Sequence, residues 1–464
     1  MRFFVLVFFY SLSLAAFSHG GMRIFYVSSS TGDNKYDGSR HRPKKNIWSI
    51  TGSIKSNVVI KLKRGDVFYE NIHHLSNVRI EAYGKGEKPI ICGFRVLKNP
   101  QAWEPIGGSI WKLELNHDEY FEGFPRSLCT TENCYNNFGC IYNPYHDKIY
   151  GHMVTTKDEL NKDGDFFITN VYRKADITPN TFRSVLFKSL ISPREMGKLC
   201  FSVFEHGISN IKRGIIKDIA IVGFARHGMC NLMNCEVNNC DLDIIGGAIQ
   251  TGTSTFIRYG NGIEFWVSDS PQSGNTTIKN CTISRTYDCG TTIQGRKGRI
   301  YDVVFKKNKI IYCRQAFEHF ISDKSLTSDY VRCRFSDNIV FEMGENQFSS
   351  PEKRDGNILS YGAPNKTLSI SNNIFYGANH YDGQFFANDM KENIVYIYPN
   401  QQLSWCHYIT EIDAIPAVES DKYKQRSGDS SKIVIVKKGT QKDMKIRKRL
   451  LRKINYHRHD LKIK

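Results

Sequence analysis

The sequence has few prolines, 13 in 464 residues, and after its first 20 residues it has neither a long apolar run nor a long helical period. A transmembrane helix needs about 20 apolar residues, so nothing in the main body is expected to span a bilayer. The chain also lacks a Cys-x-x-Cys motif and a nearby His pair at ligand spacing. These absences argue against a zinc site, and no residue is assigned to a metal.

The first residues have the pattern of a secretory signal peptide. Met1-Arg2 supplies a positive charge, an apolar run begins at Phe3, and small residues follow. Ala16 and Ser18 fit the −3 and −1 positions of a cleavage site, which predicts a signal peptide over residues 1–18. The alternative is a membrane anchor, for which the run is short. We therefore expect an exported protein, either periplasmic or at the cell surface or outside the cell.

The chain has 13 cysteines, an odd number, so at least one is unpaired or pairs between chains. Several lie inside the repeats described below, where an inward cysteine acts as a small hydrophobic residue. Cys129, Cys134 and Cys140 cluster in a stretch without clear strand signals and could form one disulfide in an oxidising compartment.

The formal charge of +18 is concentrated at the end of the chain. Residues 421–464 hold 16 Lys and Arg against 4 acids, a net charge of +12, which leaves +6 for the other 420 residues. Ile446, Leu450 and Ile454 share one helical face among these cations, which predicts a basic amphipathic helix. This tail could contact an anionic membrane surface or an acidic polymer, or merely be disordered. Nucleic acid is not an expected partner of an exported chain, and we expect a monomer.

The opening of the chain carries several small motifs in order. They are Tyr26-Val27-Ser28, Gly32-x-Asn34, Asp37-Gly38, Arg64-Gly65-Asp66, Ala82-Tyr83-Gly84 and Lys88-Pro89-Ile90-Ile91. This series resembles the opening coils of bacterial pectate-lyase-like β-helix proteins. The resemblance implies a right-handed parallel β-helix and a carbohydrate-active protein. It does not imply a particular reaction.

An internal repeat supports the same fold. A six-residue phrase with an Asn or a small residue near its centre starts at Leu232, Ile278, Phe305, Phe335 and Ile370. The starts are 46, 27, 30 and 35 residues apart, so we expect the first interval to hold two coils. Asn at a fixed place suits a bend between strands, because it tolerates left-handed backbone and can hydrogen-bond its stacked neighbour.

A second phrase lies between these repeats and predicts another file of strands. It occurs at residues 247–250, 261–264, 291–294 and 315–318. Alternation predicts that its apolar members point inward and its Gln and Glu members outward. The inward set is Ile249, Ile263, Ile293 and Phe317, and the outward set is Gln250, Glu264, Gln294 and Glu318.

The outward carboxylates are the candidates for catalysis. Glu264 and Glu318, with one coil between them, would lie roughly 9–10 Å apart, near the upper end of the window for an inverting glycosidase. Asp288 could form a closer pair with either glutamate, suited to a nucleophile or to an acid of raised pKa. The alternative is a solvated polar ladder without catalytic function.

Cations and rings near the strand entrances could bind an acidic sugar, as a polysaccharide lyase requires. Trp266 should face the same way as Glu264 and could stack on a sugar ring. These groups could equally be structural, and His319 could point inward. The substrate-binding candidates are Arg226, His227, Arg258, Tyr259, Trp266, Arg285, Gln294, Arg314 and His319.

The sequence therefore predicts an all-β protein: a right-handed parallel β-helix over residues 19–420, a loop-rich excursion at about 101–200, and a basic helical tail at 421–464. Within the excursion we expect a small β subdomain. Calcium is a possible cofactor, through Asp33, Asn34 and Asp37, although such runs are usually plain turns. The favoured function is a glycoside hydrolase acting on a polysaccharide. A polysaccharide lyase and a non-catalytic glycan-binding or capsule-assembly protein are the alternatives.

Overall fold

The computed structural model describes residues 21–97, 99–116, 139–150, 152–154, 157–169, 182–248, 258–323, 325, 327–344, 356–360, 368–377, 381–382, 389–398, 402–404, 415–416, 431–456, 459 and 461. The predicted signal peptide, Cys129, Cys134, Ile249 and Gln250 lie outside these residues. Among the described residues, no helix has the length and apolarity that crossing a membrane would require.

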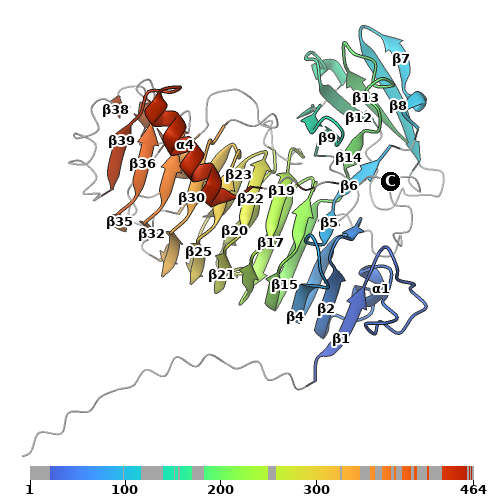
Figure 1. Ribbon diagram of the computed structural model, residues 1–464, viewed down its shortest axis with the longest axis horizontal. Coiled ribbons are helices and arrows are strands. Elements are labelled where there is room, and N and C mark those ends of the chain that lie inside the picture. Colours follow the sequence, from blue (N-terminus) through green and yellow to red (C-terminus); the bar gives the residue numbers. More distant parts are fainter. Residues whose placement is uncertain are drawn as a thin grey trace, which may run out of the picture.

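The chain forms a right-handed parallel β-helix, as the sequence predicted (Figure 1). Each coil contributes strands to three faces, and each strand pairs in parallel with its counterpart in the next coil. The first face contains β17 (His227–Met233), β20 (Ile263–Val267), β23 (Cys289–Gly295), β27 (Gln315–Ile321) and β31 (Gly356–Ser360). The second contains β18 (Glu236–Asn238), β21 (Thr276–Lys279), β25 (Val303–Lys306), β29 (Cys333–Ser336), β32 (Leu368–Ser371) and β35 (Asp389–Lys391).

The third face is a separate 10-stranded sheet. It contains β3 (Val67–Phe68), β5 (Ile90–Cys92), β16 (Ala220–Val222), β19 (Asp241–Ile245), β22 (Thr282–Thr286), β26 (Lys309–Ile311), β30 (Ile339–Phe341), β33 (Ile374–Tyr376), β36 (Ile394–Ile397) and β39 (Lys432–Ile435). Because β39 pairs with β36, the β-helix extends beyond residue 420, where the sequence analysis placed its end.

The first and second faces form one sheet because two long strands, β4 (Ile72–Tyr83) and β15 (His206–Lys217), run across both. At the N-terminal end, β1 (Arg23–Val27) pairs with β2 (Ser56–Lys63), and β2 pairs with β4. The short helix α1 (Trp48–Thr51) lies between β1 and β2 in the chain. Shorter pairings join β24 (Arg299–Tyr301) to β28 (Asp329–Val331), and β34 (Tyr381–Asp382) to β37 (Gln402–Ser404) and β38 (Ile415–Pro416).

The described part of the excursion, which falls between β5 and β15 in the chain, forms two small sheets beside the early coils (Figure 1). One contains β7 (Glu104–Gly107), β8 (Ile110–Asn116), β11 (His152–Met153), β12 (Asp165–Thr169) and β13 (Phe182–Lys188). The other contains β6 (Phe94–Val96), β9 (Ile141–Asn143), β10 (Lys148–Ile149) and β14 (Cys200–Ser202). Short 3-10 turns lie at Pro100–Ala102 and Lys157–Glu159. Cys140 is buried here as a free thiol.

The core consists of apolar side chains stacked from coil to coil. Along the second face the register aligns one inward residue per coil, each at most 1% exposed: Ile60, Ile80, Ile216, Val237, Ile278, Phe305, Phe335 and Ile370. Full burial of such a side chain contributes roughly 1.5–3 kcal/mol. The apolar positions that recur in the sequence therefore form this inward column.

The repeated six-residue phrase of the sequence forms the corner between the second and third faces. In the later coils one residue with positive φ turns the chain, as at Lys307, Asp337, Asn372 and Glu392. The next residue is a buried Asn whose side-chain amide bonds the backbone of the preceding coil, so the two roles expected of one Asn are divided between neighbours. The ladder runs through Asn308, Asn338, Asn373 and Asn393 and ends at Ser431.

The prediction that the 46-residue interval from Leu232 to Ile278 holds two coils was wrong. The phrase at Leu232 lies at a different corner, between the first and second faces, where Asn234 has φ 55°. The strands near the start and at the end of the interval, β18 and β21, pair directly, with Val237 opposite Ile278. A single coil with long connections therefore fills this part of the chain.

The described part of the basic tail, from residue 431 on, belongs to the folded body. Helix α4 (Gln441–Ile454) lies along the third face (Figure 1), with fully buried Leu450 and Ile454 packed in a cluster with Phe341 and Tyr376. Arg447 forms an ion pair with Glu342. The predicted apolar face is thus covered by the protein itself, while the other cations point to solvent: Lys442, Lys445, Lys448, Arg449, Arg452 and Lys453. Contact of these cations with an anionic surface stays a prediction.

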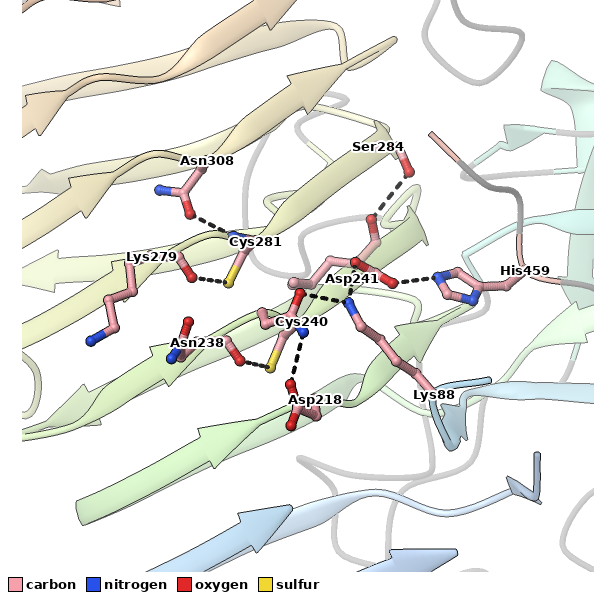
Figure 2. Close-up of polar contacts among 12 residues, drawn as sticks. Lys88, Asp218, Asn238, Cys240, Asp241, Lys279, Cys281, Ser284, Asn308 and His459 are labelled. Atoms are coloured by element: carbon pink, nitrogen blue, oxygen red, sulfur yellow. Dashed lines mark hydrogen bonds and ion pairs between the residues drawn. The ribbon is translucent and has the colours of Figure 1, made fainter. Parts of the chain in front are cut away.

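Beyond α4 the chain returns to the early coils. The Nε2 atom of His459 lies 3.3 Å from Asp241 of β19, and the Nζ atom of Lys88 lies 2.8 Å from the same carboxylate (Figure 2). Leu461 joins a buried cluster that includes Ile90 and Cys92. The tail is therefore fixed at both ends of the third face.

The Asn ladder generates a prediction about stability. The Asn338 amide accepts from the Asn308 N–H at 2.8 Å and donates to the Phe305 carbonyl at 3.1 Å. Asn338→Ala leaves both backbone groups buried without their partner, so we expect the free energy of unfolding to fall by about 1–3 kcal/mol per unsatisfied group. Urea titration followed by circular dichroism measures the change.

Asn238→Ala is the matched control, because the Asn238 amide accepts a single exposed hydrogen bond, from Asn280. Its loss should be under about 1 kcal/mol. Equal effects of the two variants would show that the ladder does not stabilise the corner.

Candidate functional site

The candidate site lies on the outward side of the first face. Its orientation follows from three glycines, Gly228, Gly262 and Gly290, whose added Cβ atoms would meet inward side chains of the third face. The residues just before them therefore point outward. The outward residues form three rows across the coils: His206, His227, Asn261, Cys289 and Gln315; Ser209, Cys230, Glu264, Thr292 and Glu318; and Trp266, Gln294 and Phe320.

The register corrects one alignment made from the sequence. Thr292, not Gln294, lies between Glu264 and Glu318, because Glu264 pairs with Thr292 and Thr292 with Glu318. Gln294 lies in the next row, opposite Trp266. The prediction that one coil separates the two glutamates holds, and Trp266 does face the same way as Glu264, with 39% of its surface exposed.

Glu264 is surrounded by hydrogen-bond donors. Its Oε2 atom accepts from the amides of Asn261 at 3.0 Å and Gln294 at 2.9 Å, and its Oε1 atom lies 3.4 Å from Nε2 of His227. Its side chain is 15% exposed. These donors fix the position of the carboxylate on the outward side of the strand.

Asp288, Cys289 and Glu318 form a second group one coil further on. One ligand atom from each lies within 4.8 Å of the others. The thiol of Cys289 is 3.0 Å from the amide oxygen of Gln315 and 3.4 Å from a carboxylate oxygen of Glu318. Burial raises the pKa of Asp288, and Glu264 raises it further, while Arg314, 3.9 Å away, lowers it. Among the described residues, this group could share one cation.

Histidines and aromatics border Glu264 toward the early coils. The rings of His206 and His227 are stacked at 5.3 Å, and Tyr259 meets His227 edge-on. Arg226 lies over the Tyr259 ring at 3.8 Å and donates to Glu205 at 3.0 Å. Burial lowers the pKa of both imidazoles, so they are neutral at physiological pH.

Two predicted arginines have other tasks. Arg285 does not belong to the first face, because it lies in β22 on the third face and its guanidinium binds Asp243 and Asp147. It therefore joins the β-helix to the excursion, and its assignment to the substrate was wrong. Arg258 donates to the carbonyl of Gly247 at 2.8 Å and lies over the ring of Tyr287.

His319 was also assigned wrongly. It occupies the inward row of the first face, beside Ile293, and its ring packs against Phe317 and Tyr330. It is 6% exposed, and burial lowers its pKa to about 3. Of the nine substrate-binding candidates, the structure thus brings together Arg226, His227, Tyr259, Trp266 and Gln294 around Glu264, with Arg314 beside Asp288.

The sequence analysis missed Asn261, Cys289, Thr292, Gln315 and Glu205. Asn261 and Gln315 open the two phrases that contain Glu264 and Glu318. Each precedes its glutamate by the same number of residues, and this shared spacing could have identified them from the sequence. Thr292 has a fully buried hydroxyl, in the row between the two glutamates, that finds no hydrogen-bond partner among the described residues. Nothing in its sequence context distinguishes it from other threonines.

The suggested calcium ligands near the N-terminus form turns. Asp33 accepts from the N–H of Lys35, Asp37 from that of Ser39, and Asn34 from those of Lys45 and Asn46. These oxygens are thus engaged by the main chain. Calcium binding at these residues stays a prediction.

No family model and no curated protein matches the chain. Similar solved structures include the complex of XylC with xylose, at 10% identity and TM-score 0.48, covering 89% of this chain and 83% of that one. The native lacto-N-biosidase GH136 from Eubacterium ramulus is 12% identical at TM-score 0.35, with coverages of 89% and 67%. Pectate lyase Pel9A is 10% identical at TM-score 0.38, with coverages of 90% and 78%. A proposal for this chain therefore depends on its own residues.

The buried His319 predicts a pH effect on stability. Its pKa is about 3 when folded but about 6.5 in an unfolded chain, so only the unfolded state takes up a proton as the pH falls between these values. The free energy of unfolding should fall by up to ~1.4 kcal/mol per pH unit because of this group. His319→Leu should remove that part of the slope in urea titrations between pH 6 and 4.

The exposed His41 provides the control, because His41→Leu should leave the slope unchanged. Parallel pH profiles for wild type and His319→Leu would mean that His319 titrates alike in both states.

Proposed function

We propose that the protein is an exported glycoside hydrolase that acts on a polysaccharide through the outward carboxylates of its first face. The observation that carries the proposal is the convergence of Glu264, Asp288 and Glu318 in different electrostatic environments. A polar ladder formed only for solubility would leave such carboxylates in water. Here Glu264 and Glu318 are mostly buried, and burial raises the pKa of Asp288.

The environments suggest the roles. A carboxyl group of raised pKa retains its proton and can donate it to a leaving glycosidic oxygen, which suits Asp288. Glu264 receives two amide donors that hold its carboxylate in place, which suits the partner role of base or nucleophile. Glu318 lies beside Asp288, with one carboxylate oxygen of each within 4.8 Å of the other.

The spacing offers two stereochemical outcomes. Glu264 and Glu318 are two coils apart, roughly 9–10 Å along the stack, which suits a water molecule between them and inversion. A pair as close as Asp288 and Glu318, whose oxygens lie within 4.8 Å, suits a covalent intermediate and retention. Proton NMR of the first anomer released distinguishes the two.

The cations favour a hydrolase over a lyase. A lyase needs positive charge to neutralise a uronate during removal of its C5 proton. Arg226 is bonded to Glu205, Arg258 to a carbonyl, and Arg285 to two aspartates. Arg314 is balanced by Asp288. These cations already serve groups of the protein.

Turnover should depend on both Asp288 and Glu264. Asp288→Asn and Glu264→Gln should each reduce the release of reducing ends from a cleaved polysaccharide by about 10²-fold or more, the usual contribution of general acid–base catalysis. The assay uses a panel of neutral and acidic polysaccharides, with and without a chelator. Glu236→Gln is the control, since Glu236 lies exposed on the second face and pairs with Lys279.

Full activity in Asp288→Asn, with unchanged folding by circular dichroism, would contradict the assignment. A product with the ultraviolet absorption of a new C4–C5 double bond would indicate a lyase instead. Loss of activity in chelator would indicate a metal ion held by Asp288, Cys289 and Glu318. Binding without any product would indicate a glycan-binding protein.

The second prediction concerns Trp266. Its exposed ring lies one row from Glu264 and can stack on the apolar face of a sugar, an interaction worth roughly 0.5–1.5 kcal/mol. Trp266→Ala should therefore raise KM by about 2- to 10-fold with little change in kcat, whereas Trp266→Phe should retain most of the affinity. A drop in kcat with unchanged KM would place the substrate elsewhere.

A further inference from the structure

Cys240 and Cys281 occupy equivalent places in consecutive coils, at the corner between the second and third faces. Each follows a residue of positive φ, Asn239 or Asn280. The strands on both sides are in register, with Asn238 opposite Lys279 and Asp241 opposite Thr282. The two cysteines are therefore direct neighbours along the stack.

The same corner carries the Asn ladder in the later coils. The backbone N–H of Cys281 donates to the side chain of Asn308, the first amide of that ladder, at 3.0 Å. Cys240 and Cys281 extend the ladder by two positions, but they replace amides with thiols (Figure 2). Both side chains are fully buried.

Each thiol bonds a carbonyl of its own coil. The sulfur of Cys240 lies 3.5 Å from the carbonyl oxygen of Asn238, and the sulfur of Cys281 lies 3.3 Å from that of Lys279. Other cysteines in register stack on different residues: Cys230 on Glu264, Cys289 on Gln315, and Cys333 on Leu368.

We propose that Cys240 and Cys281 are a disulfide-forming pair that links two consecutive coils when the protein matures in an oxidising compartment. Neighbouring strands lie about 4.8 Å apart, within the ~4.4–6.8 Å between Cα atoms that a disulfide tolerates. The Cβ atoms must approach to about 4.5 Å or less, a shift of a few tenths of an ångström. A corner, unlike the middle of a strand, can supply such a shift.

The chemistry is a thiol–disulfide exchange with a small-molecule disulfide such as oxidised glutathione. One cysteine thiolate attacks the oxidant, forms a mixed disulfide and releases one glutathione thiol. The second cysteine then attacks the mixed disulfide, forms the Cys240–Cys281 bond and releases the second glutathione thiol. Two cysteine thiols are oxidised, and one glutathione disulfide is reduced to two thiols.

The bond would close a covalent loop around the segment that carries one part of the candidate site. Residues 241–280 include β20 with Glu264 and Trp266, and also the long connections of this coil. The two thiols are fully buried in the folded protein, so the exchange belongs to folding or to a local opening of the corner. The inference does not depend on the protein being a hydrolase.

The test uses the full-length protein in two arms. In one, the protein refolds from denaturant with oxidised glutathione or with dithiothreitol. In the other, the folded and reduced protein is incubated with oxidised glutathione below its melting transition. Digestion without reduction and mass spectrometry should give a linked Cys240–Cys281 peptide that is two hydrogens lighter than its separate parts.

The thermal midpoint of the oxidised protein should rise by several degrees over the reduced form. Cys240→Ala/Cys281→Ala should abolish both the linked peptide and the redox-dependent shift. Cys235→Ala, which removes a buried thiol at the other corner of the same coil, should retain both. Free or glutathione-capped Cys240 and Cys281 in both arms, or links from either cysteine to others, would overturn the proposal.

Discussion

Parallel register between coils is the constraint on which the rest of the structure depends. Because each strand lies directly on its counterpart, a residue type placed once per coil becomes a continuous column through the molecule. Isoleucine and phenylalanine form the inner column of the second face, and asparagine forms a hydrogen-bonded column at one corner. The site arises by the same rule, because residues distant in sequence, such as Glu264 and Glu318, are placed in one outward row.

The features that repeat from coil to coil could be predicted from the sequence. The fold, the recurring corner, the outward direction of Glu264 and the amphipathic helix at the end all follow from short periodic patterns. It failed where a coil departs from the common length. The interval after Leu232 holds one coil with long connections, and spacing alone cannot distinguish that from two. The row of Gln294 was misjudged by two residues because a phrase of small and apolar residues fits β23 in more than one alignment.

Single side chains were less predictable because their roles depend on partners from other coils. Arg285 resembled a binding residue until Asp243 and Asp147, far apart in the chain, were found on its guanidinium. His319 follows a catalytic candidate but falls on the opposite side of the strand, in the core. Burying carboxylates and imidazoles without full pairing is costly, so their concentration on one face is the strongest sign that this face has a task besides stability.

The returning tail changes how such a stack can come apart. A linear array of coils, in which each contacts only its neighbours, can fray from its ends one coil at a time. Here α4 covers the late coils, while His459 and Leu461 reach early ones. The last segment of the chain thereby links the two ends of the array. Loss of the terminal coils would first require release of contacts near β5 and β19, so unfolding should be more cooperative than the repetitive architecture suggests.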